Sequence, residues 1–433
     1  MKEIALINHG CAKNLVDSEL MLGKLTQKGY KITLDDSKAD IVIVNTCSFI
    51  HDAEKESVQS IFEMINSGKK VIITGCLPQK YKKELQELIP EASAFLGTSE
   101  LDKIADVIMQ LDGNNVTYEV DENPQYEYPE DIKRQQITMG ASSYIKIADG
   151  CDFKCGYCII PQLRGPYKSR KIENIVKEAK ELAEKGVNEI VLIAQDTTSY
   201  GKDIYKKPSL KELLTELNKI EDLSWIRIMY AYPSMLDDEL LKAINGLEKV
   251  VKYIDIPLQH VSKNVLDLMD RPVMDNRELI NKIRKYIPNA AIRTTFIVGY
   301  PGETEEDFEE LCDFVKEMKL DKVGVFEFSK EKNTKAYSLK PQVPAKIKKQ
   351  RHKKLMEIQQ NVSKEINEKL IGQNIDCIIE AISETGEVVG RTYKDAPEVD
   401  GLVYINTTNP VNPGDIITAK VTGAVEYDLI AEY

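Results

Sequence analysis

SYIKIADGCDFKCGYC, residues 143–158, decides the fold of this 433-residue chain. Its first half is a largely apolar run that predicts a strand. Its second half places Cys151, Cys155 and Cys158 in a C-x3-C-x2-C spacing, close enough for one short loop to wrap a metal centre. A structural zinc ion needs four ligands, yet no further cysteine or histidine follows until His260. Three thiolates on a four-iron cubane would instead leave one iron open to another ligand.

The region 137–345 repeats this strand-first pattern. Helical patterns such as 173–185 and 209–219 separate its apolar runs. The six expected strands are 143–149, 189–195, 225–230, 253–259, 292–299 and 322–328. Six such units are too few for a closed eight-stranded barrel, so they predict an open, partial barrel with its chemistry at the C-terminal strand ends.

Residues 1–110 also alternate short apolar runs with amphipathic stretches. Helical patterns cover 18–27 and 53–66, and the expected strands are 3–8, 40–46, 70–75 and 93–98. Strands that alternate with helices predict an open parallel sheet with helices on its faces.

Cys11, Cys47 and Cys76 are far apart in the sequence but share one context. Each follows the C-terminal end of an expected parallel strand, after INHG, IVNT and IITG respectively. In open α/β sheets these strand ends line one crevice, where ligands bind. Buried free thiols are the alternative explanation, but strand-end loops are a poor place for core side chains.

The remaining segments have distinct compositions. Residues 111–136 are polar and acidic and predict a linker with at most one short strand. A charged helix is expected over 346–369. Residues 370–433 are rich in β-formers and turn residues, which predicts a small five-stranded, OB-like barrel. The fold class is therefore multidomain α/β, with an N-terminal parallel sheet, a central partial (βα)6 barrel and a terminal β-barrel.

The chain has 30% charged residues and a net charge of −12. This composition is typical of globular proteins. No apolar run has the length of a membrane span, and the first residues make a poor secretory signal. We therefore expect a cytoplasmic protein, whose eight cysteines stay reduced and serve metal binding or catalysis. Cys312 and Cys377 are isolated within a helical and a strand pattern, so we expect them to be core or incidental positions.

Together these features resemble the radical S-adenosylmethionine methylthiotransferases over essentially the whole chain, with a TRAM-type barrel at the end. Within that family the sequence is most similar to the RimO-type enzymes, which methylthiolate an aspartate of small ribosomal subunit protein 12. The matching segments are HGCAKNLVDSE (9–19), NTCSFI (45–50), TGCLPQKY (74–81), CIIPQLRGPYKSR (158–170) and DAPEVDG (395–401).

The resemblance implies two 4Fe–4S clusters and S-adenosylmethionine, which acts as radical source and methyl donor. Cys151, Cys155 and Cys158 would hold the radical cluster and be catalytic, and Cys11, Cys47 and Cys76 would hold the second cluster. The target would be the β-carbon of the aspartate, whose C–H bond no side-chain base could break. Expected contacts to S-adenosylmethionine are Tyr157, Gln195, Asp196, Gly299, Gly302 and Glu303. The basic run 164–171 could contact the cofactor or substrate, or be a solvated loop.

Substrate choice is expected to depend on the terminal barrel, through Asp395, Glu398 and Asp400 in DAPEVDG. From 370 to 433 there are three basic and eleven acidic residues. Such a domain repels phosphates and attracts a basic ribosomal protein, so we expect no dedicated RNA binding. An electron donor such as flavodoxin or ferredoxin and a sulfur donor are further expected partners, and the ribosome itself is a candidate partner.

Two alternatives remain. The first is a tRNA adenosine methylthiotransferase with the same chemistry. The second is a non-catalytic iron–sulfur or zinc protein that binds ribosomes. Electron carriers normally use four ligands per cluster, so two sets of three cysteines favour catalysis over the second alternative.

Overall fold

The computed structural model describes residues 2–111, 116–137 and 140–433. The chain forms two compact units. Unit 1 contains Met1–Met139, Ala148–Lys154 and Cys158–Arg170, and unit 2 contains Gly140–Ile147, Cys155–Tyr157 and Lys171–Tyr433. The C-x3-C-x2-C loop is thus divided, with Cys155 in unit 2.

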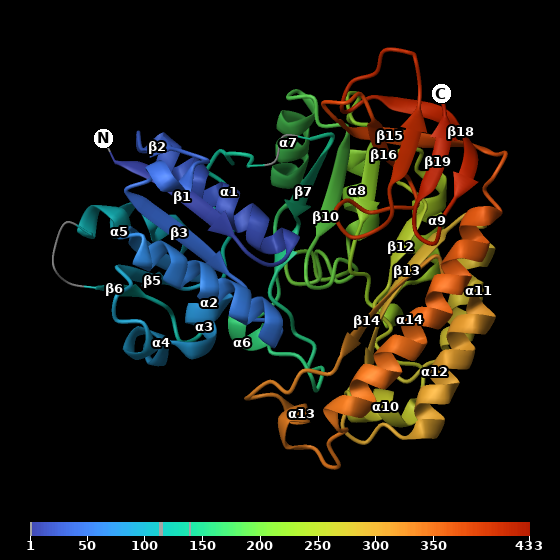
Figure 1. The fold of residues 1–433 in the computed structure, drawn as a ribbon, viewed down its shortest axis with the longest axis horizontal. Helices are drawn as coiled ribbons and strands as arrows, with labels where there is room; N and C mark the ends of the chain where they lie inside the picture. The colour runs from blue at the N-terminus through green and yellow to red at the C-terminus, as the bar shows by residue number, and fades with distance from the viewer. Residues whose placement is uncertain (1, 112–115, 138–139) are drawn as a thin grey trace. The chain divides into compact units, whose positions relative to one another are not determined.

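Unit 1 is built on a six-stranded parallel sheet with the order β2-β1-β3-β4-β5-β6 (Figure 1). Its strands are β1 (Glu3–Asn8), β2 (Lys31–Ile32), β3 (Ile41–Thr46), β4 (Lys70–Gly75), β5 (Ala94–Leu96) and β6 (Thr117–Glu119). Its helices are α1 (Ala12–Gln27), α2 (His51–Asn66), α3 (Cys76–Tyr81), α4 (Lys83–Leu88), α5 (Ile104–Gln110) and α6 (Ile160–Arg164), with short 3-10 turns at Asp36–Lys38 and Leu101–Lys103. A small two-stranded ribbon, β8 (Ala148–Asp149) and β9 (Lys168–Ser169), flanks the cysteine loop.

The strands of this sheet are apolar on both faces because helices cover both. Ile41 and Ile43 of β3 pack in a core with α1 and α5. Val42 and Val44 of the same strand pack in a second core with α2, α3 and α4. The expected sheet is therefore present, extended by β2 at one edge and by β6, which arises from the segment expected to be a linker.

Unit 2 contains the six strands expected for the partial barrel, and all except β13 are somewhat shorter than their sequence patterns. They form two three-stranded ladders, β7-β10-β11 and β12-β13-β14, with parallel pairing. A single bridge between Ile226 and Val250 marks the approach of β11 to the segment before β12. The strands are β7 (Ser142–Lys146), β10 (Glu189–Ile193), β11 (Trp225–Ile228), β12 (Tyr253–Asp255), β13 (Ala291–Val298) and β14 (Lys322–Glu327).

Helices follow the strands of these ladders, as a right-handed βα pattern requires. They are α7 (Ile172–Ala183), α8 (Leu210–Leu217), α9 (Asp238–Gly246), α10 (Lys263–Leu268), α11 (Asn276–Tyr286), α12 (Glu305–Met318) and α13 (Lys335–Ser338), with a 3-10 turn at Pro233–Met235. The charged helix α14 (Ala345–Glu368) packs against α12 and β14. Within the described part of the chain, no helix is both long enough and apolar enough to cross a membrane.

The C-terminal strands close into a barrel with the order β15-β16-β17-β19-β18 (red in Figure 1). They are β15 (Asn374–Ile382), β16 (Val388–Thr392), β17 (Val403–Asn406), β18 (Ile416–Ala424) and β19 (Leu429–Glu432). Buried and exposed residues alternate along β17, β18 and β19, so the barrel has an apolar interior and a polar outside. The expected five-stranded barrel is confirmed.

A buried ion-pair network joins this barrel to the β7-β10-β11 ladder within unit 2. Arg391 of β16 contacts Glu189 of β10 at 2.5 Å and Glu380 of β15 at 2.5 Å. Arg227 of β11 contacts the other carboxylate oxygen of Glu189 at 2.7 Å. Burial alone would raise the pKa of Glu189, but Arg227 and Arg391 lower it to about 2. The glutamate is therefore ionised, and its ion pairs link the barrel to the β7-β10-β11 ladder.

Arg391→Met is expected to lower the free energy of unfolding by about 3 kcal/mol, because it leaves buried carboxylates with less compensation. Urea denaturation followed by circular dichroism measures the change. Lys420→Met is the matched control, since Lys420 is exposed on β18 and should change stability by less than about 0.5 kcal/mol. Equal effects of the two substitutions would contradict an anchoring role for Arg391.

Candidate functional site

Cys11, Cys47 and Cys76 follow three neighbouring strands of the unit 1 sheet. Cys11 caps the N-terminus of α1, Cys47 comes directly after β3, and Cys76 is the first residue of α3. Because β1, β3 and β4 are adjacent and parallel, their C-terminal ends lie at one edge of the sheet. The structure therefore brings together the three thiols that are far apart in the sequence.

Gly10 allows Cys11 and Cys47 to approach each other. Its φ of +96° is unfavourable for residues with a Cβ, and an added Cβ would lie 3.1 Å from the sulfur of Cys47. Any side chain at position 10 would collide with Cys47 and with the Asn14 amide.

The three thiols also interact through their charges. Burial first, and then the neighbouring Cys76, raises the pKa of Cys47 to about 12. Burial also raises the pKa of Cys76, with a further contribution from Cys11 and an opposing one from Arg164. Desolvation opposes ionisation of Cys11, but Lys13 and Arg164 lower its pKa overall. Three thiolates at this edge would therefore need a positive group among them, which bound iron ions supply.

The donor set suits a cluster better than a single ion. Among the described residues, no three His, Cys, Asp or Glu side chains are grouped closely enough to hold one metal ion. A four-iron cluster takes each thiolate on a different iron, so its ligands need not converge on one point. Three mutually interacting thiols at a strand-end crevice fit that requirement.

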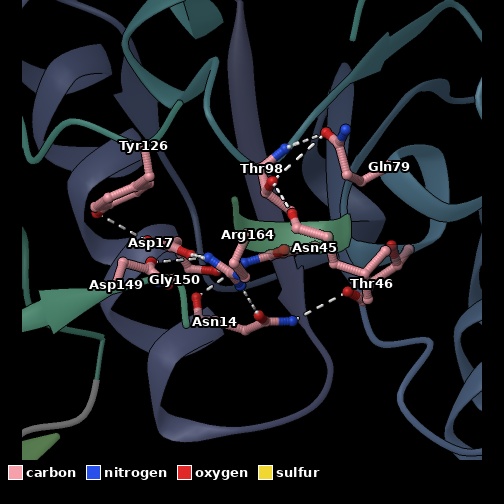
Figure 2. A network of polar contacts seen from close by, with 12 residues as sticks. Asn14, Asp17, Asn45, Thr46, Gln79, Thr98, Tyr126, Asp149, Gly150 and Arg164 are labelled. Carbon is pink, nitrogen blue, oxygen red and sulfur yellow. Dashed lines mark hydrogen bonds and ion pairs between the residues drawn. The ribbon is translucent and has the colours of Figure 1, made fainter. Parts of the chain in front are cut away.

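Amide side chains hold the strand ends next to these cysteines, and Figure 2 shows two of them, Asn14 and Asn45. Asn14 Nδ2 donates to the carbonyl oxygens of His9 and Thr46, each at 3.0 Å. Asn45 Nδ2 donates to the carbonyl oxygen of Asn14 at 2.8 Å. The backbone N–H of Cys47 donates to Ser57 Oγ at 3.0 Å. Asn14 lies in HGCAKNLVDSE, but the sequence offered no sign of what its side chain contacts.

Cys151 and Cys158 lie on the unit 1 part of the divided loop. The N–H of Cys151 donates to the carbonyl oxygen of Gly165 at 3.1 Å. The sulfur of Cys158 accepts from the N–H of Ile160 at 3.4 Å, at the start of α6. Both cysteines are partly exposed, which leaves them accessible as ligands.

Cys155 and Tyr157 lie on the unit 2 part of the loop, on either side of Gly156. The N–H of Gly156 donates to the carbonyl of Met269, and its carbonyl accepts from the N–H of Ala336, both at 2.8 Å. Tyr157 packs against the apolar cluster that contains Met269 and Ala336. These contacts attach the loop to the segment after α10 and to α13.

Arg271 is a site residue that the sequence analysis missed. Its Nη1 lies 3.8 Å from the sulfur of Cys155, and its guanidinium stacks on Tyr232 at 4.2 Å. Its other terminal nitrogen donates to the carbonyl of Pro257 at 2.6 Å. A buried cation beside Cys155 stabilises negative charge on that sulfur. No local pattern around Arg271 distinguishes it from other arginines.

Gln195 and Asp196 follow β10, whose ladder ends at Ile193. Asp196 is 2% exposed and accepts from the N–H of Thr198 at 2.9 Å. Burial raises the pKa of its carboxyl, against hydrogen bonds from Ser199 and Thr198. Both residues thus lie at a C-terminal strand end, and their contact with S-adenosylmethionine stays a prediction.

The turn after β13 contains Gly299, Gly302 and Glu303. Both glycines have positive φ, and a Cβ on them would meet Lys348 and Leu268 respectively. A side chain at either position would therefore collide with a neighbouring side chain. Glu303 accepts from Tyr300 N–H at 2.8 Å and from Arg351 at 3.0 Å. Burial outweighs Arg351 and raises the pKa of Glu303 to about 7. Cofactor binding by this turn stays a prediction.

The acidic residues of DAPEVDG have different environments within unit 2. Asp395 is buried and pairs with Lys322 at 2.6 Å. Asp400 accepts from the Tyr253 hydroxyl at 2.6 Å and lies 3.4 Å from Arg293. Glu398 is exposed. Two of the three carboxylates thus hold the segment in place, and Glu398 is the one accessible to a partner.

The basic run 164–171 is not a solvated loop throughout. Arg164 is 2% exposed. Arg170 is buried against Glu130 at 2.8 Å and stacks on Tyr128 at 3.5 Å, all within unit 1. Cys312 and Cys377, expected in the core, are both fully buried.

Three family models match the chain. The Radical SAM superfamily matches residues 145–315, Uncharacterized protein family UPF0004 matches residues 3–97, and the TRAM domain matches residues 371–433. The first cysteine set lies within the second of these matches, and the C-x3-C-x2-C loop lies within the first. The models thus cover both cysteine sets and the terminal barrel.

Among solved structures, the chain is similar to the radical S-adenosylmethionine methyltransferase TsrM from Kitasatospora setae, solved with cobalamin and a [4Fe–4S] cluster bound. The TM-score is 0.56 at 14% identity, over 86% of this chain and 79% of that chain. The same enzyme with tryptophan and a SAM analogue bound gives a TM-score of 0.54 at 14% identity, over 75% and 73%. At such identity the likeness shows the fold alone.

Curated relatives match over the full length. A protein of Caldanaerobacter subterraneus named ribosomal protein uS12 methylthiotransferase RimO is 49% identical over 100% of both chains. Proteins of the same name from Crocosphaera subtropica and Clostridioides difficile are 46% and 44% identical, over 98% of both chains and over 100% and 99% respectively. The matches extend from the first cysteine set through the barrel. The chain therefore belongs to the ribosomal protein uS12 methylthiotransferase (RimO) family, whose members are radical S-adenosylmethionine enzymes with 4Fe–4S clusters.

Proposed function

We propose that this enzyme adds a methylthio group to the β-carbon of an aspartate in ribosomal protein uS12. The observation that carries the proposal is the match to RimO proteins at 49% identity over the whole chain, terminal barrel included. Relatives that share only the catalytic core would match the cysteine loops without the barrel. The proposed location is the cytoplasm, whose reducing conditions would keep the cysteine thiols available as ligands.

The two cysteine sets have separate tasks in this proposal. Cys151, Cys155 and Cys158 would hold the radical cluster, and Cys11, Cys47 and Cys76 would hold the second cluster, which would supply the sulfur for transfer. When bound, the clusters and S-adenosylmethionine supply the radical, the sulfur and the methyl group. An external electron donor, such as a flavodoxin or ferredoxin, and an external sulfur donor complete the reaction.

Residues of unit 2 position the cofactor. Arg271 stabilises negative charge on Cys155, since its guanidinium lies 3.8 Å from that sulfur. The other cofactor contacts are proposed at the strand ends and at the loop, namely Tyr157, Gln195, Asp196, Gly299, Gly302 and Glu303. Glu303 is held by Arg351 and by the Tyr300 N–H, so its carboxylate orientation is set before any ligand binds.

Substrate choice follows from the charge of the barrel. Within the fully described residues 370–433, the exposed acidic side chains are Asp376, Glu384, Glu387, Glu398, Asp415 and Glu432, against one exposed basic side chain, Lys420. Nucleic-acid-binding barrels need cations for the phosphates. This barrel would repel a tRNA and attract a basic protein. Glu398 would contact the protein, while Asp395 and Asp400 would hold its segment in place.

A product assay tests the substrate. Anaerobically reconstituted enzyme, S-adenosylmethionine, reductant and sulfide are incubated with uS12 or with bulk tRNA in separate tubes, and both are analysed by mass spectrometry. A methylthio adduct on one aspartate of uS12, with unmodified tRNA, is expected. An adduct on a tRNA nucleoside would keep the chemistry but overturn the substrate. 5′-Deoxyadenosine without either adduct would contradict both substrates.

A further inference from the structure

Arg164 is the centre of a buried polar network within unit 1 (Figure 2). Its guanidinium donates to Asp17 at 2.6 Å, to Asp149 at 3.3 Å and to the side-chain oxygen of Asn14 at 2.6 Å. The side chains of Arg164 and Asp17 are each 3% exposed, and that of Asp149 is fully buried. Tyr126 adds a hydroxyl contact to Asp17 at 3.4 Å. Burying one cation and two carboxylates is costly, so the arrangement calls for a functional explanation.

The network adjoins the first cysteine set through Asn14 on one side and through the segment before Arg164 on the other. Asn14 follows Cys11 by one turn of α1, and its amide holds the Thr46 carbonyl next to Cys47. On the other side, Cys76 packs against Ile159 and Leu163, which precede Arg164 in the chain. The Thr98 hydroxyl fixes this segment by donating to the Leu163 carbonyl at 2.5 Å. Arg164 is thus held in a fixed position beside the thiols.

Two charges of opposite sign therefore lie beside the first cysteine set. Arg164 follows Leu163, which packs in one cluster with Cys76, and its guanidinium donates to Asn14, whose amide holds the backbone next to Cys47. Asp17 lies on α1, the helix that Cys11 precedes, and pairs with that guanidinium at 2.6 Å. Arg164 and Asp17 are both buried. Low-dielectric surroundings screen a charge only weakly, so these two charges act on the nearby cysteine sulfur atoms.

We propose that Arg164 and Asp17 are positioning residues that set the charge balance, and hence the reduction potential, of the cluster held by Cys11, Cys47 and Cys76. The reduction potential of an iron–sulfur cluster depends on net charge and on hydrogen bonds to its sulfur ligands. Reduction adds a negative charge, so a nearby cation favours the reduced cluster and a nearby carboxylate favours the oxidised one. The inference rests on the cluster assignment proposed above.

The test uses full-length protein in which Cys151, Cys155 and Cys158 are all replaced with alanine, so that the first set holds the remaining cluster. Arg164→Met and Asp17→Asn are introduced separately, and each protein is titrated with dithionite while the reduced cluster is followed by EPR. Arg164→Met should lower the ratio of reduced to oxidised cluster at a fixed potential by about tenfold, which is about 59 mV for a one-electron couple. Asp17→Asn should raise that ratio.

A purely structural role would not produce shifts of opposite sign. Arg170→Met is the matched control, because Arg170 is a buried arginine in the same segment that pairs with Glu130; it should leave the potential unchanged. Asp17→Asn preserves the side-chain shape, so it carries the test even if Arg164→Met fails to fold.

Unchanged potentials, or shifts of the same sign for both variants, would overturn the inference while leaving the cluster assignment intact. A triple-alanine protein without any cluster would overturn the assignment and the inference together. Retention of the potential by Arg164→Lys would support the role of charge, since that substitution keeps the cation.

Discussion

Replacing Cys155 with alanine is expected to abolish formation of 5′-deoxyadenosine from S-adenosylmethionine. Cys155 is one of three cysteines in the loop, and it has its own cation, Arg271, at 3.8 Å. Mutation of residues that only hydrogen-bond to a metal ligand typically lowers metal affinity or activity by roughly 10–100-fold. Loss of a thiolate ligand itself should lower the activity by more than that. Anaerobic incubation with dithionite, followed by liquid chromatography of the nucleosides, measures the product.

Cys312→Ala is the control for this experiment. Cys312 is fully buried in α12, outside both cysteine sets, so its replacement removes a thiol without removing a ligand. It should retain nucleoside formation near the level of the unmodified enzyme. Retained cleavage by the Cys155→Ala protein would show that the C-x3-C-x2-C loop is not the radical site.

Replacing Cys76 with alanine is expected to separate the two halves of the reaction. Cys76 belongs to the strand-end set, where it packs against Ile159 and Leu163 and feels the charges of Cys11 and Arg164. Because the radical loop keeps its cysteines, 5′-deoxyadenosine should still form. Transfer of the methylthio group to uS12 should fall by more than roughly 100-fold, since the second cluster loses a ligand.

Both products are measured in one reaction, the nucleoside by chromatography and the modified uS12 peptide by mass spectrometry. Iron content distinguishes loss of one cluster from loss of both, and Cys377→Ala, a buried cysteine of the barrel, is the matched control. Undiminished transfer by the Cys76→Ala protein would contradict a role for the first set in sulfur transfer.

Much of the fold follows from periodic patterns that are local in the chain. Four of the six strands of the N-terminal sheet (β1, β3, β4 and β5) and the six strands of the partial barrel were expected within a few residues, because buried parallel strands are short continuous apolar runs. The helix at 346–369 and the five-stranded barrel were expected for similar reasons. The strand β6 lies in the segment expected to be a linker with at most one short strand, and its pairing with β5 adds it to the sheet, which no local pattern specifies.

The site was partly predictable. The sequence predicted the glycine turn after β13. It gave no sign that Lys348 of α14 fills the space next to Gly299. The DAPEVDG carboxylates were anticipated as a group, yet Asp395 and Asp400 form buried pairs with Lys322 and Arg293, far away in the sequence. A sequence pattern cannot identify such partners. A charged residue has the same letter whether it is solvated by water or paired with another side chain.

The sequence by itself determined the chemistry: two sets of three cysteines, one closely spaced in a loop and one placed after parallel strands. It did so because strand-end positions and ligand spacing are properties of local chain order. Only the tertiary structure decided which charges surround those sulfur atoms. Arg164, which the sequence left undecided within a basic run, is buried between Asp17, Asp149 and Asn14. Electrostatic energy depends on distance and burial rather than on separation along the chain, so it is fixed only when the segments fold together.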